Sequence, residues 1–352
     1  MTDLRVHPDC PSVADALLTR GVTRRTLLKL CAGIAAGLAL PAAEAATIAR
    51  ALAQEPRPRV LWLALQGCTG CTESATRAHE PTLESLILES LSLDYHTTLM
   101  AAAGDAAQSA LREGLREGLR ERSYVLVVEG AVPRPGGVCT SGGEDDTAVL
   151  RRAAAGASLI LAVGSCAAFG GLPAATPNPT GARGVADDLA AAGLPVDRLV
   201  NLPGCPPLPQ ALAGTLVHWL TYRRLPALDG ARRPLAYYGT TVHQRCSRLA
   251  HFRARRFARS FDDAGARRGW CLLKLGCRGP STANACTRLG WNGVDAYPMR
   301  AGHGCIGCSQ PGFWDGGGLY EPRPPARGGR RAQGLHGAGA QRRTRRQSRR
   351  RT

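Results

Sequence analysis

The stretch VLWLALQGCTGCTES, residues 60–74, decides the fold, because a short apolar run leads directly into two cysteines. Two further apolar runs, LILAVG (159–164) and RLVNLPG (198–204), also end close to a cysteine. Such runs are typical of strands buried in a parallel sheet. Because ligands bind outside the carboxyl ends of parallel strands, we expect four thiols at one sheet edge. We call them the first group: Cys68, Cys71, Cys166 and Cys205.

Strand and helix patterns alternate through residues 54–225. YVLVVEG (124–130) predicts another buried strand, and the stretches between the strands predict helices. The predicted helices are PTLESLILESLSL (81–93), GDAAQSALREGLREGLRE (104–121), AVLRRAAAGA (148–157), the end of PNPTGARGVADDLAAAG (177–193) and ALAGTLVHWLTY (211–222). This alternation predicts an α/β, flavodoxin-like doubly wound parallel sheet.

The chain changes character near residue 226. Periodic segments become sparse in residues 226–321, so we expect a smaller, irregular domain that needs cross-linking by bound metal. Residues 322–352 contain 11 Arg and no acidic residue, and we expect this tail to be disordered. Two interpretations of the tail are open: it binds anionic lipid or an acidic partner, or the reading frame has shifted. After Phe313-Trp314-Asp315 the sequence has no run of about 18 apolar residues, the length that a membrane-spanning helix needs.

The N-terminus predicts a targeting segment over residues 1–53. A twin-arginine pattern, TRRTLLK (23–29), precedes the apolar run LLKLCAGIAAGLAL (27–40). Small-residue cleavage sites follow at 43–45 and 51–53. The alternative is an anchoring helix, but the apolar run is short for a membrane span. We therefore expect export by the twin-arginine machinery, which carries folded proteins.

The net charge of +18 does not indicate a nucleic-acid-binding protein. Removing the tail leaves +7, and removing the signal segment as well leaves +5 for residues 54–321. This value is ordinary for the size of the chain.

The 13 cysteines indicate metal more than disulfides. Cys10 and Cys31 lie in the signal segment, which leaves an odd number in a chain too large to need disulfide cross-links. On ligand count, the first group suits zinc or an iron–sulfur cluster. A second group, which zinc would also suit, comprises His243, Cys246, Cys271 and Cys277. A third group comprises Cys286, Cys305 and Cys308.

The third group lacks an obvious fourth ligand. His303 could complete a zinc site, or three thiolates could hold a cluster that lacks one iron. Cys139 is left over, and we interpret it as a non-ligand.

An ordered set of motifs over residues 57–320 resembles the small subunit of NiFe hydrogenases. The motifs are CTGCTES, VVEGAVP, GSCAAFGG, PNPTG, GCPP, TVHQRC, LGCRGPSTANAC and AGHGCIGCSQPGFWD. The resemblance implies that the first group holds a proximal 4Fe-4S cluster. It likewise implies a medial 3Fe-4S cluster in the third group and a distal 4Fe-4S cluster in the second group.

The resemblance also implies a function. The chain would pass electrons from H2 oxidation at the NiFe centre of a large subunit, its heterodimer partner, to a membrane cytochrome b or quinone-linked acceptor. It would act at the periplasmic face of the cytoplasmic membrane.

Two glycines refine this expectation. Oxygen-tolerant members of the family carry extra cysteines at the positions of Gly70 and Gly171. The resemblance therefore implies an ordinary four-cysteine proximal cluster and an oxygen-sensitive complex. Glu73 and Glu129 lie near the same ligands. Proton transfer, interface contact and a solvated or hydrogen-bonded loop carboxylate are the open interpretations for them.

Overall fold

The computed structural model describes residues 32–33, 35–36, 40–41, 43–48, 57–79, 82–85, 91–121, 124–291, 294–315 and 319–321. The twin-arginine pattern, the second cleavage site and the Arg-rich tail lie outside the described residues. All described residues belong to one compact unit of the chain. None of the helices described in it is long and apolar enough to cross a membrane.

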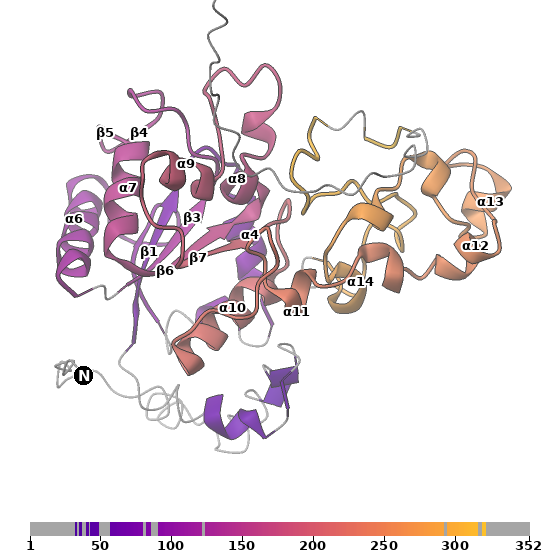
Figure 1. Cartoon of the computed structure of the whole chain (residues 1–352), viewed down its shortest axis with the longest axis horizontal. Helices are drawn as coiled ribbons and strands as arrows, with labels where there is room; N and C mark the ends of the chain where they lie inside the picture. The colour runs from indigo at the N-terminus through magenta and orange to yellow at the C-terminus, as the bar shows by residue number, and fades with distance from the viewer. Residues whose placement is uncertain are drawn as a thin grey trace, which may run out of the picture. The chain divides into compact units, whose positions relative to one another are not determined.

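In the described residues, seven strands and a series of helices follow one another (Figure 1). The strands are β1 (Arg59–Ala64), β2 (Ser92–His96), β3 (Tyr124–Glu129), β4 (Thr140–Ser141), β5 (Glu144–Asp145), β6 (Ala157–Val163) and β7 (Leu199–Leu202). The α-helices are α4 (Gly70–Thr76), α5 (Leu83–Ser85), α6 (Gly104–Glu121), α7 (Asp146–Gly156), α8 (Gly164–Phe169), α9 (Val185–Ala191), α10 (Pro209–Tyr222), α11 (Leu235–Tyr238), α12 (Leu249–Arg253), α13 (Ala264–Arg267) and α14 (Cys286–Leu289). The 3₁₀ helices are η2 (Leu172–Ala174), η3 (Val242–Arg245), η4 (Leu273–Leu275) and η5 (Gly279–Ser281).

The central sheet has five parallel strands in the order β2-β1-β3-β6-β7. Counted along the chain, this is the 2-1-3-4-5 order of flavodoxin-like folds. The predicted fold class is therefore confirmed. The small antiparallel pair β4-β5 stands apart from this sheet.

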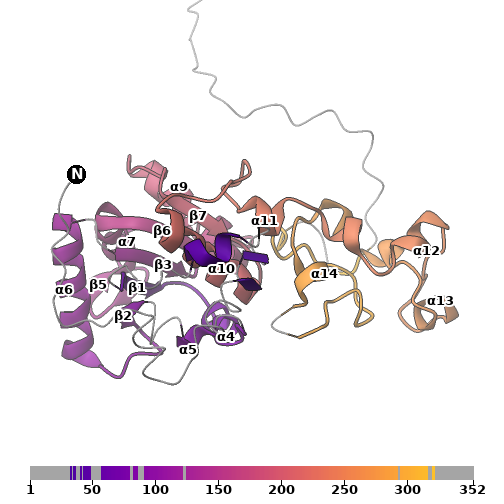
Figure 2. The same cartoon turned by 90° about the horizontal axis from the view of Figure 1, so that it is seen from below.

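Two apolar layers cover the sheet, because successive side chains of a strand point to opposite faces. Val60 and Trp62 belong to one buried cluster together with helix α10. Leu61 and Leu63 belong to another cluster together with α6, α7 and α9. Figures 1 and 2 show these helices on the two faces.

The region after α10 shares the core of the sheet. Tyr237, Tyr238, Met299 and Cys305 belong to the same buried cluster as α10. Among the described residues, the region after α10 forms one separate hydrophobic cluster. This cluster is small and comprises Ala258, Leu272 and Leu275. As expected, the region after α10 has only a small hydrophobic core of its own. The domain boundary at residue 226 stays a prediction.

The helix predicted over residues 81–93 is wrong at its C-terminal end. Helix α5 ends at Ser85, and Ser92 and Leu93 begin β2 at the edge of the sheet. Residues 86–90 lie outside the described residues. The sequence of the edge strand, SLDYH, alternates polar and apolar residues, but the preceding leucine-rich stretch obscures this pattern. The burial of the strand does not alternate, because Tyr95 and His96 are both buried.

Candidate metal centres

The first group of thiols lies on loops that follow three strands of the sheet. Cys68 and Cys71 come after β1, at the start of α4, and Cys166 lies in α8 directly after β6. Cys205 follows β7 by three residues. The ends of β6 and β7 are joined, because Ser165 N donates to Gly204 O at 2.9 Å and Gly204 N donates to Ser165 Oγ at 3.0 Å.

The four thiols of this group lie close enough to influence one another electrostatically. Burial, followed by the charges of Glu129 and of the other three thiols, raises the pKa of Cys71 well above its usual value. Burial and the charge of Cys205 are the main causes that raise the pKa of Cys166 to about 11. Because burial and neighbouring charges oppose ionisation of Cys71 and Cys166, a bound cation would be needed to hold these two as thiolates.

Glu129 lies behind this group as a buried carboxylate, with 2% of its surface exposed. It accepts hydrogen bonds from Cys71 N at 2.9 Å, Thr72 N at 3.2 Å, Thr72 Oγ1 at 2.5 Å and Trp62 Nε1 at 3.2 Å. The first turn of α4 presents free N–H groups, which a carboxylate satisfies. Glu129 therefore fixes the backbone that carries Cys71. It is a hydrogen-bonded carboxylate that solvent does not reach.

His96 extends this buried network. Its Nδ1 accepts from the backbone N–H groups of Thr98 at 3.0 Å and Leu99 at 3.3 Å. The proton therefore sits on Nε2, which lies 3.3 Å from Thr72 Oγ1. Burial lowers the pKa of His96, which keeps the ring neutral. The series of hydrogen bonds from His96 through Thr72 and Glu129 thus ends at the backbone of Cys71.

Glu73 has a different environment. Its side chain is about half exposed and pairs with Arg77 one turn later, at 2.6 Å between Oε1 and Nε. It lies on the exposed side of α4.

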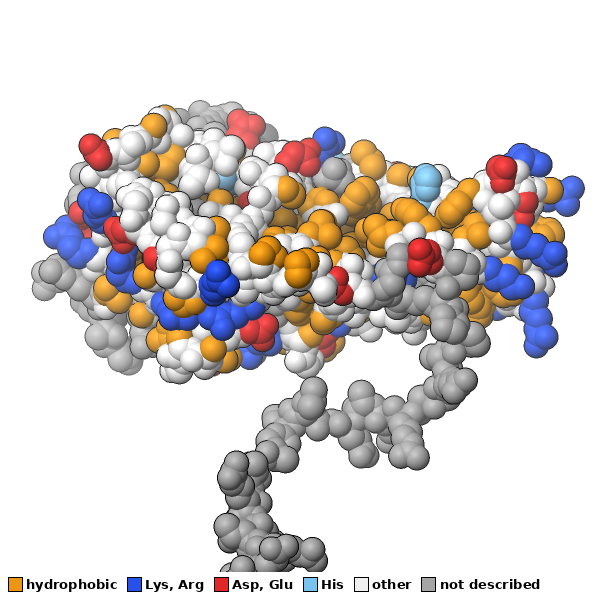
Figure 3. All heavy atoms as spheres, turned by 90° about the horizontal axis from the view of Figure 1, so that it is seen from above, with side chains coloured by type: hydrophobic (Ala, Val, Ile, Leu, Met, Phe, Trp, Pro, Cys, Tyr) orange, Lys and Arg blue, Asp and Glu red, His pale blue; other side chains and the backbone are white. Residues whose placement is uncertain are grey.

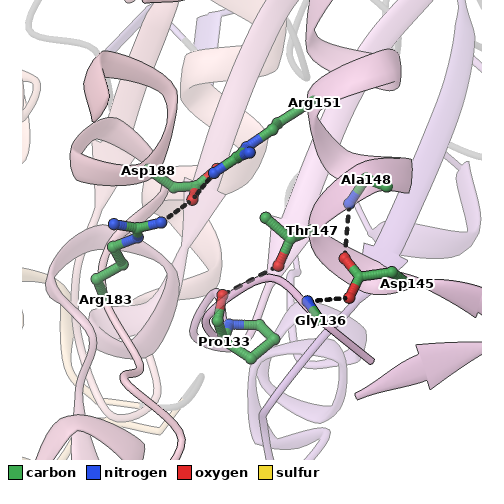
Figure 4. Close-up of polar contacts among 8 residues, drawn as sticks. All are labelled: Pro133, Gly136, Asp145, Thr147, Ala148, Arg151, Arg183 and Asp188. Carbon is green, nitrogen blue, oxygen red and sulfur yellow. Dashed lines mark hydrogen bonds and ion pairs between the residues drawn. The ribbon is translucent and has the colours of Figure 1, made fainter. Parts of the chain in front are cut away.

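An ion-pair network holds the loops next to α8 (Figure 4). Asp188 in α9 is fully buried and accepts from Arg151 Nε and Nη2, both at 2.9 Å, and from Arg183 Nη2 at 2.6 Å. The backbone of Arg183 pairs with Val132 after β3. Figure 4 also shows Asp145 capping α7 and binding Gly136 N. These contacts fix the loop that packs on the C-terminal end of α8 at Gly170.

The third group surrounds a cavity of about 310 Å³. Cys286, Cys305 and Cys308 line it, and so does Cys205 of the first group. Burial is the largest cause that raises the pKa of Cys308, to about 12, and the charge of Cys305 adds to it. A single zinc ion lies about 2.3 Å from each thiolate, so it would leave most of such a cavity empty.

Direct contacts arrange the three groups in a row. Ser165 Oγ, beside Cys166, donates to the carbonyl oxygen of Cys308. Cys305 N donates to Cys277 Sγ at 3.2 Å, which joins the third group to the second. The third group therefore lies between the first and the second, although the second precedes it in the sequence.

The second group brings its three thiols together around short 3₁₀ elements. Cys246 follows η3, Cys277 follows η4, and the charges of Cys277 and Cys246 contribute, after burial, to the raised pKa of Cys271. His243 lies in η3. Gly279 lies between the His243 backbone and the Cys277 side chain, because a Cβ at Gly279 would be within 4 Å of both His243 N and Cys277 Sγ. The His243 ring packs edge-on against Phe252, with centroids 4.4 Å apart.

Comparisons with known proteins place this geometry in a family. Residues 238–321 match the family of the C-terminal part of the NiFe/NiFeSe hydrogenase small subunit, and residues 68–219 match the family of the NADH ubiquinone oxidoreductase 20 Kd subunit. The chain is 45% identical to the periplasmic [NiFe] hydrogenase small subunit 1 of Nitratidesulfovibrio vulgaris, over 86% of this chain and 93% of that protein. The chain belongs to the NiFe hydrogenase small-subunit family.

Other relatives agree. The uptake hydrogenase small subunit of Azotobacter vinelandii is 44% identical over 87% of this chain and 84% of its own length. A [NiFeSe]-hydrogenase structure from Desulfomicrobium baculatum superposes with a TM-score of 0.68 at 33% identity, over 76% of this chain and all of that one. The chain is thus a subunit of NiFe hydrogenase, of the periplasmic and uptake type. Family membership implies iron–sulfur clusters and a large subunit as partner.

The donor sets of this hydrogenase subunit fit iron–sulfur clusters. No three His, Cys, Asp or Glu side chains in the described part of the chain converge on a point as the ligands of one ion do. Cluster ligands bind separate irons and need wider spacing. None of the 11 described cysteines forms a disulfide. His303 lines the third group's cavity, with its ring 6.1 Å from those of Phe261 and Tyr320.

Cys139 interacts with Gln66 and Asp146. Burial and the charge of Asp146 raise its pKa, and Gln66 hydrogen-bonds to it. The roles of Ser165 and of the partners of Glu129 were not predicted from the sequence. The position of Ser165 directly before Cys166 was the available signal for Ser165. The partners of Glu129 come from two segments, β1 and α4, that lie far from it in the sequence.

Proposed function

We propose that this hydrogenase subunit is a three-cluster electron relay. Cys68, Cys71, Cys166 and Cys205 hold a proximal 4Fe-4S cluster in this proposal. Cys286, Cys305 and Cys308 hold a medial 3Fe-4S cluster, and His243, Cys246, Cys271 and Cys277 hold a distal 4Fe-4S cluster. When bound, the clusters pass single electrons, so that the two electrons of H2 leave the large subunit in steps.

The row of ligand groups is the observation that carries the proposal. The Ser165–Cys308 and Cys305–Cys277 contacts make the third group the bridge between the other two. The residues around each group do the positioning. Glu129 holds the backbone of Cys71, and Ser165 joins the first group to the third. The His243 imidazole makes its site less negative than four thiolates would, which suits an exit site.

The cellular setting is part of the same proposal. The relatives named as periplasmic and the twin-arginine pattern support export by that route and action at the periplasmic face of the membrane. The terminal acceptor would be a membrane cytochrome b linked to quinone. Gly70 and Gly171 support an ordinary proximal cluster and a complex that loses activity in air.

Iron and acid-labile sulfide analysis of the purified complex tests the cluster assignment. Two 4Fe sites and one 3Fe site require about eleven irons in this subunit, beyond the iron of the NiFe centre. Electron paramagnetic resonance of the oxidised complex should show the signal of one 3Fe-4S cluster. A colourless subunit loaded with zinc would contradict the proposal.

A further inference from the structure

Basic residues are concentrated around the second ligand group. Residues 243–277 contain nine Lys or Arg and two Asp, a net charge of +7. Residues 54–321 together carry +5, so the rest of that range is slightly negative. Eight of the nine basic side chains are exposed. We call these eight the basic patch. It comprises Arg245, Arg253, Arg255, Arg256, Arg259, Arg267, Arg268 and Lys274. Figure 3 shows Lys and Arg side chains around α12 and α13, at the right of the view.

The basic patch is built on the elements that carry the ligands. Arg245 directly precedes Cys246, and Lys274 lies in η4 between Cys271 and Cys277. Aromatic contacts connect these positions to His243: Phe252 packs on the His243 ring, and Phe257 lies 6.0 Å from Phe252. Lys274 Nζ lies 5.5 Å from the Phe257 ring centre. A protein docked on the basic patch would therefore lie next to the second ligand group.

The charges of the basic patch are not neutralised within the described part of the subunit. None of its eight side chains forms an ion pair with another described residue. The two acidic residues bind local partners: Asp263 caps α13 by accepting from Ala266 N at 2.6 Å, and Asp262 accepts from the Ser260 hydroxyl. Unpaired charges of one sign attract an oppositely charged partner over a Debye length of about 10 Å.

We propose that the basic patch docks an acidic electron-carrier protein. This inference rests on the proposed role of the second group as the electron exit. A lipid surface would also attract the charges, but it cannot take an electron from a site that it covers. Each encounter would move one electron from the exit site to the carrier, and H2 oxidation at the large subunit would replace it. Exposed Phe261, 5.7 Å from the Tyr320 ring, offers an apolar contact beside the charges.

Two forms of one c-type cytochrome test the proposal. The unmodified protein has a basic surface, and succinylation of its lysines makes the surface acidic while keeping the haem. We expect the intact heterodimer under H2 to reduce the succinylated form about tenfold faster at low ionic strength. This preference should shrink as salt is raised to about 0.3 M, where screening is strong.

Charge reversals locate the docking surface. The double variant Arg256→Glu/Arg259→Glu should lose most of the preference for the acidic cytochrome. The matched control Arg112→Glu/Arg116→Glu changes the net charge equally on α6 and should keep the preference. The tail is present in all of these proteins, so its charge cannot explain a difference between them.

Distinct outcomes separate the failure of this inference from the failure of the relay. If the wild-type complex reduces benzyl viologen with H2 but does not prefer the acidic cytochrome, docking of an acidic carrier is refuted and the relay stands. If it reduces no acceptor, the relay itself is refuted. If the reversals weaken binding to phosphatidylserine vesicles and leave the cytochrome preference unchanged, the basic patch faces lipid and the inference is overturned.

Discussion

At the scale of single residues, Glu129 shows how a buried acid can position a candidate metal ligand by binding its backbone. Four donors from two segments, β1 and α4, converge on its carboxylate, and two of them are backbone N–H groups at the start of α4. Such a site is stable because each buried donor has a partner, and removing the acceptor leaves them unsatisfied. The position of Cys71 thus depends on a residue that lies 58 positions away in the sequence.

Replacing Glu129 tests this dependence. In Glu129→Gln, the amide NH2 cannot accept, so at least one buried donor loses its partner at a cost of about 1–3 kcal/mol. Loss of the negative charge should also raise the midpoint potential of the proximal site, measured by redox titration with paramagnetic resonance. Glu73→Gln on the exposed side of the same helix is the control, with an expected change of about 0.5 kcal/mol or less. Equal effects of the two variants would argue against the positioning role.

Gly171 offers a second test at this scale. Its φ of +57° lies in a region that favours glycine, and a Cβ there would lie 2.5 Å from Cys166 Sγ and 2.6 Å from Cys166 Cα. We therefore expect Gly171→Cys to lose iron from the complex. At Gly70, a Cβ would meet Cys68 Sγ at 3.1 Å and nothing else within 4 Å, so Gly70→Cys should retain more iron. Full iron content in Gly171→Cys would show that this loop adapts.

His96 makes stability depend on pH. The unfolded chain binds a proton at His near pH 6.5, whereas burial lowers the pKa of the folded ring. The unfolded state therefore binds more protons below pH 6.5, and stability falls as pH decreases through this range, by at most about 1.4 kcal/mol per pH unit. The His96→Gln variant should lose less stability between pH 7.5 and 5.5, as measured by thermal unfolding. Identical pH profiles would contradict a neutral, buried His96.

At the scale of elements, the sequence predicted what is local. The stretch 104–121 was expected as a helix and is α6, because its apolar and charged residues alternate at helical spacing. Strand β2 was missed, because Leu83, Leu91 and their neighbours continue a helical pattern up to the start of the strand. This segment is recognised as a strand from its pairing with β1. Edge strands depend on tertiary contacts more than on their own composition.

The Asp188 network gives a prediction for the elements around Cys166. In Asp188→Asn, Arg151 and Arg183 keep their charges and lose their shared partner. Breaking a buried ion pair by removing one partner costs on the order of 3 kcal/mol, and the partial exposure of both arginines reduces this cost. Asp187→Asn, on the same helix but exposed, should change thermal stability little. A similar stability of both variants would show that the network does not hold α8 and its loop.

At the scale of the whole molecule, the sequence predicts which residues belong to each ligand group, but it does not predict the order of the groups in space. The contacts Ser165–Cys308 and Cys305–Cys277 join residues that are 143 and 28 positions apart. No local sequence pattern in these segments predicts that they come into contact. The basic patch was overlooked for a related reason, since the net charge of residues 54–321 averages a positive surface with a slightly negative remainder.

The central claim is that the third group connects the other two. Freeze-quench paramagnetic resonance of the complex after mixing with H2, in wild type and Cys308→Ala, tests it most directly. Cys308 lies in the bridging group, so the variant should lose the 3Fe-4S signal. In the variant, we predict that the proximal site is still reduced within the wild-type time, whereas reduction of the distal site is slowed by orders of magnitude. Reduction of the distal site at the wild-type rate without the middle cluster would contradict the relay.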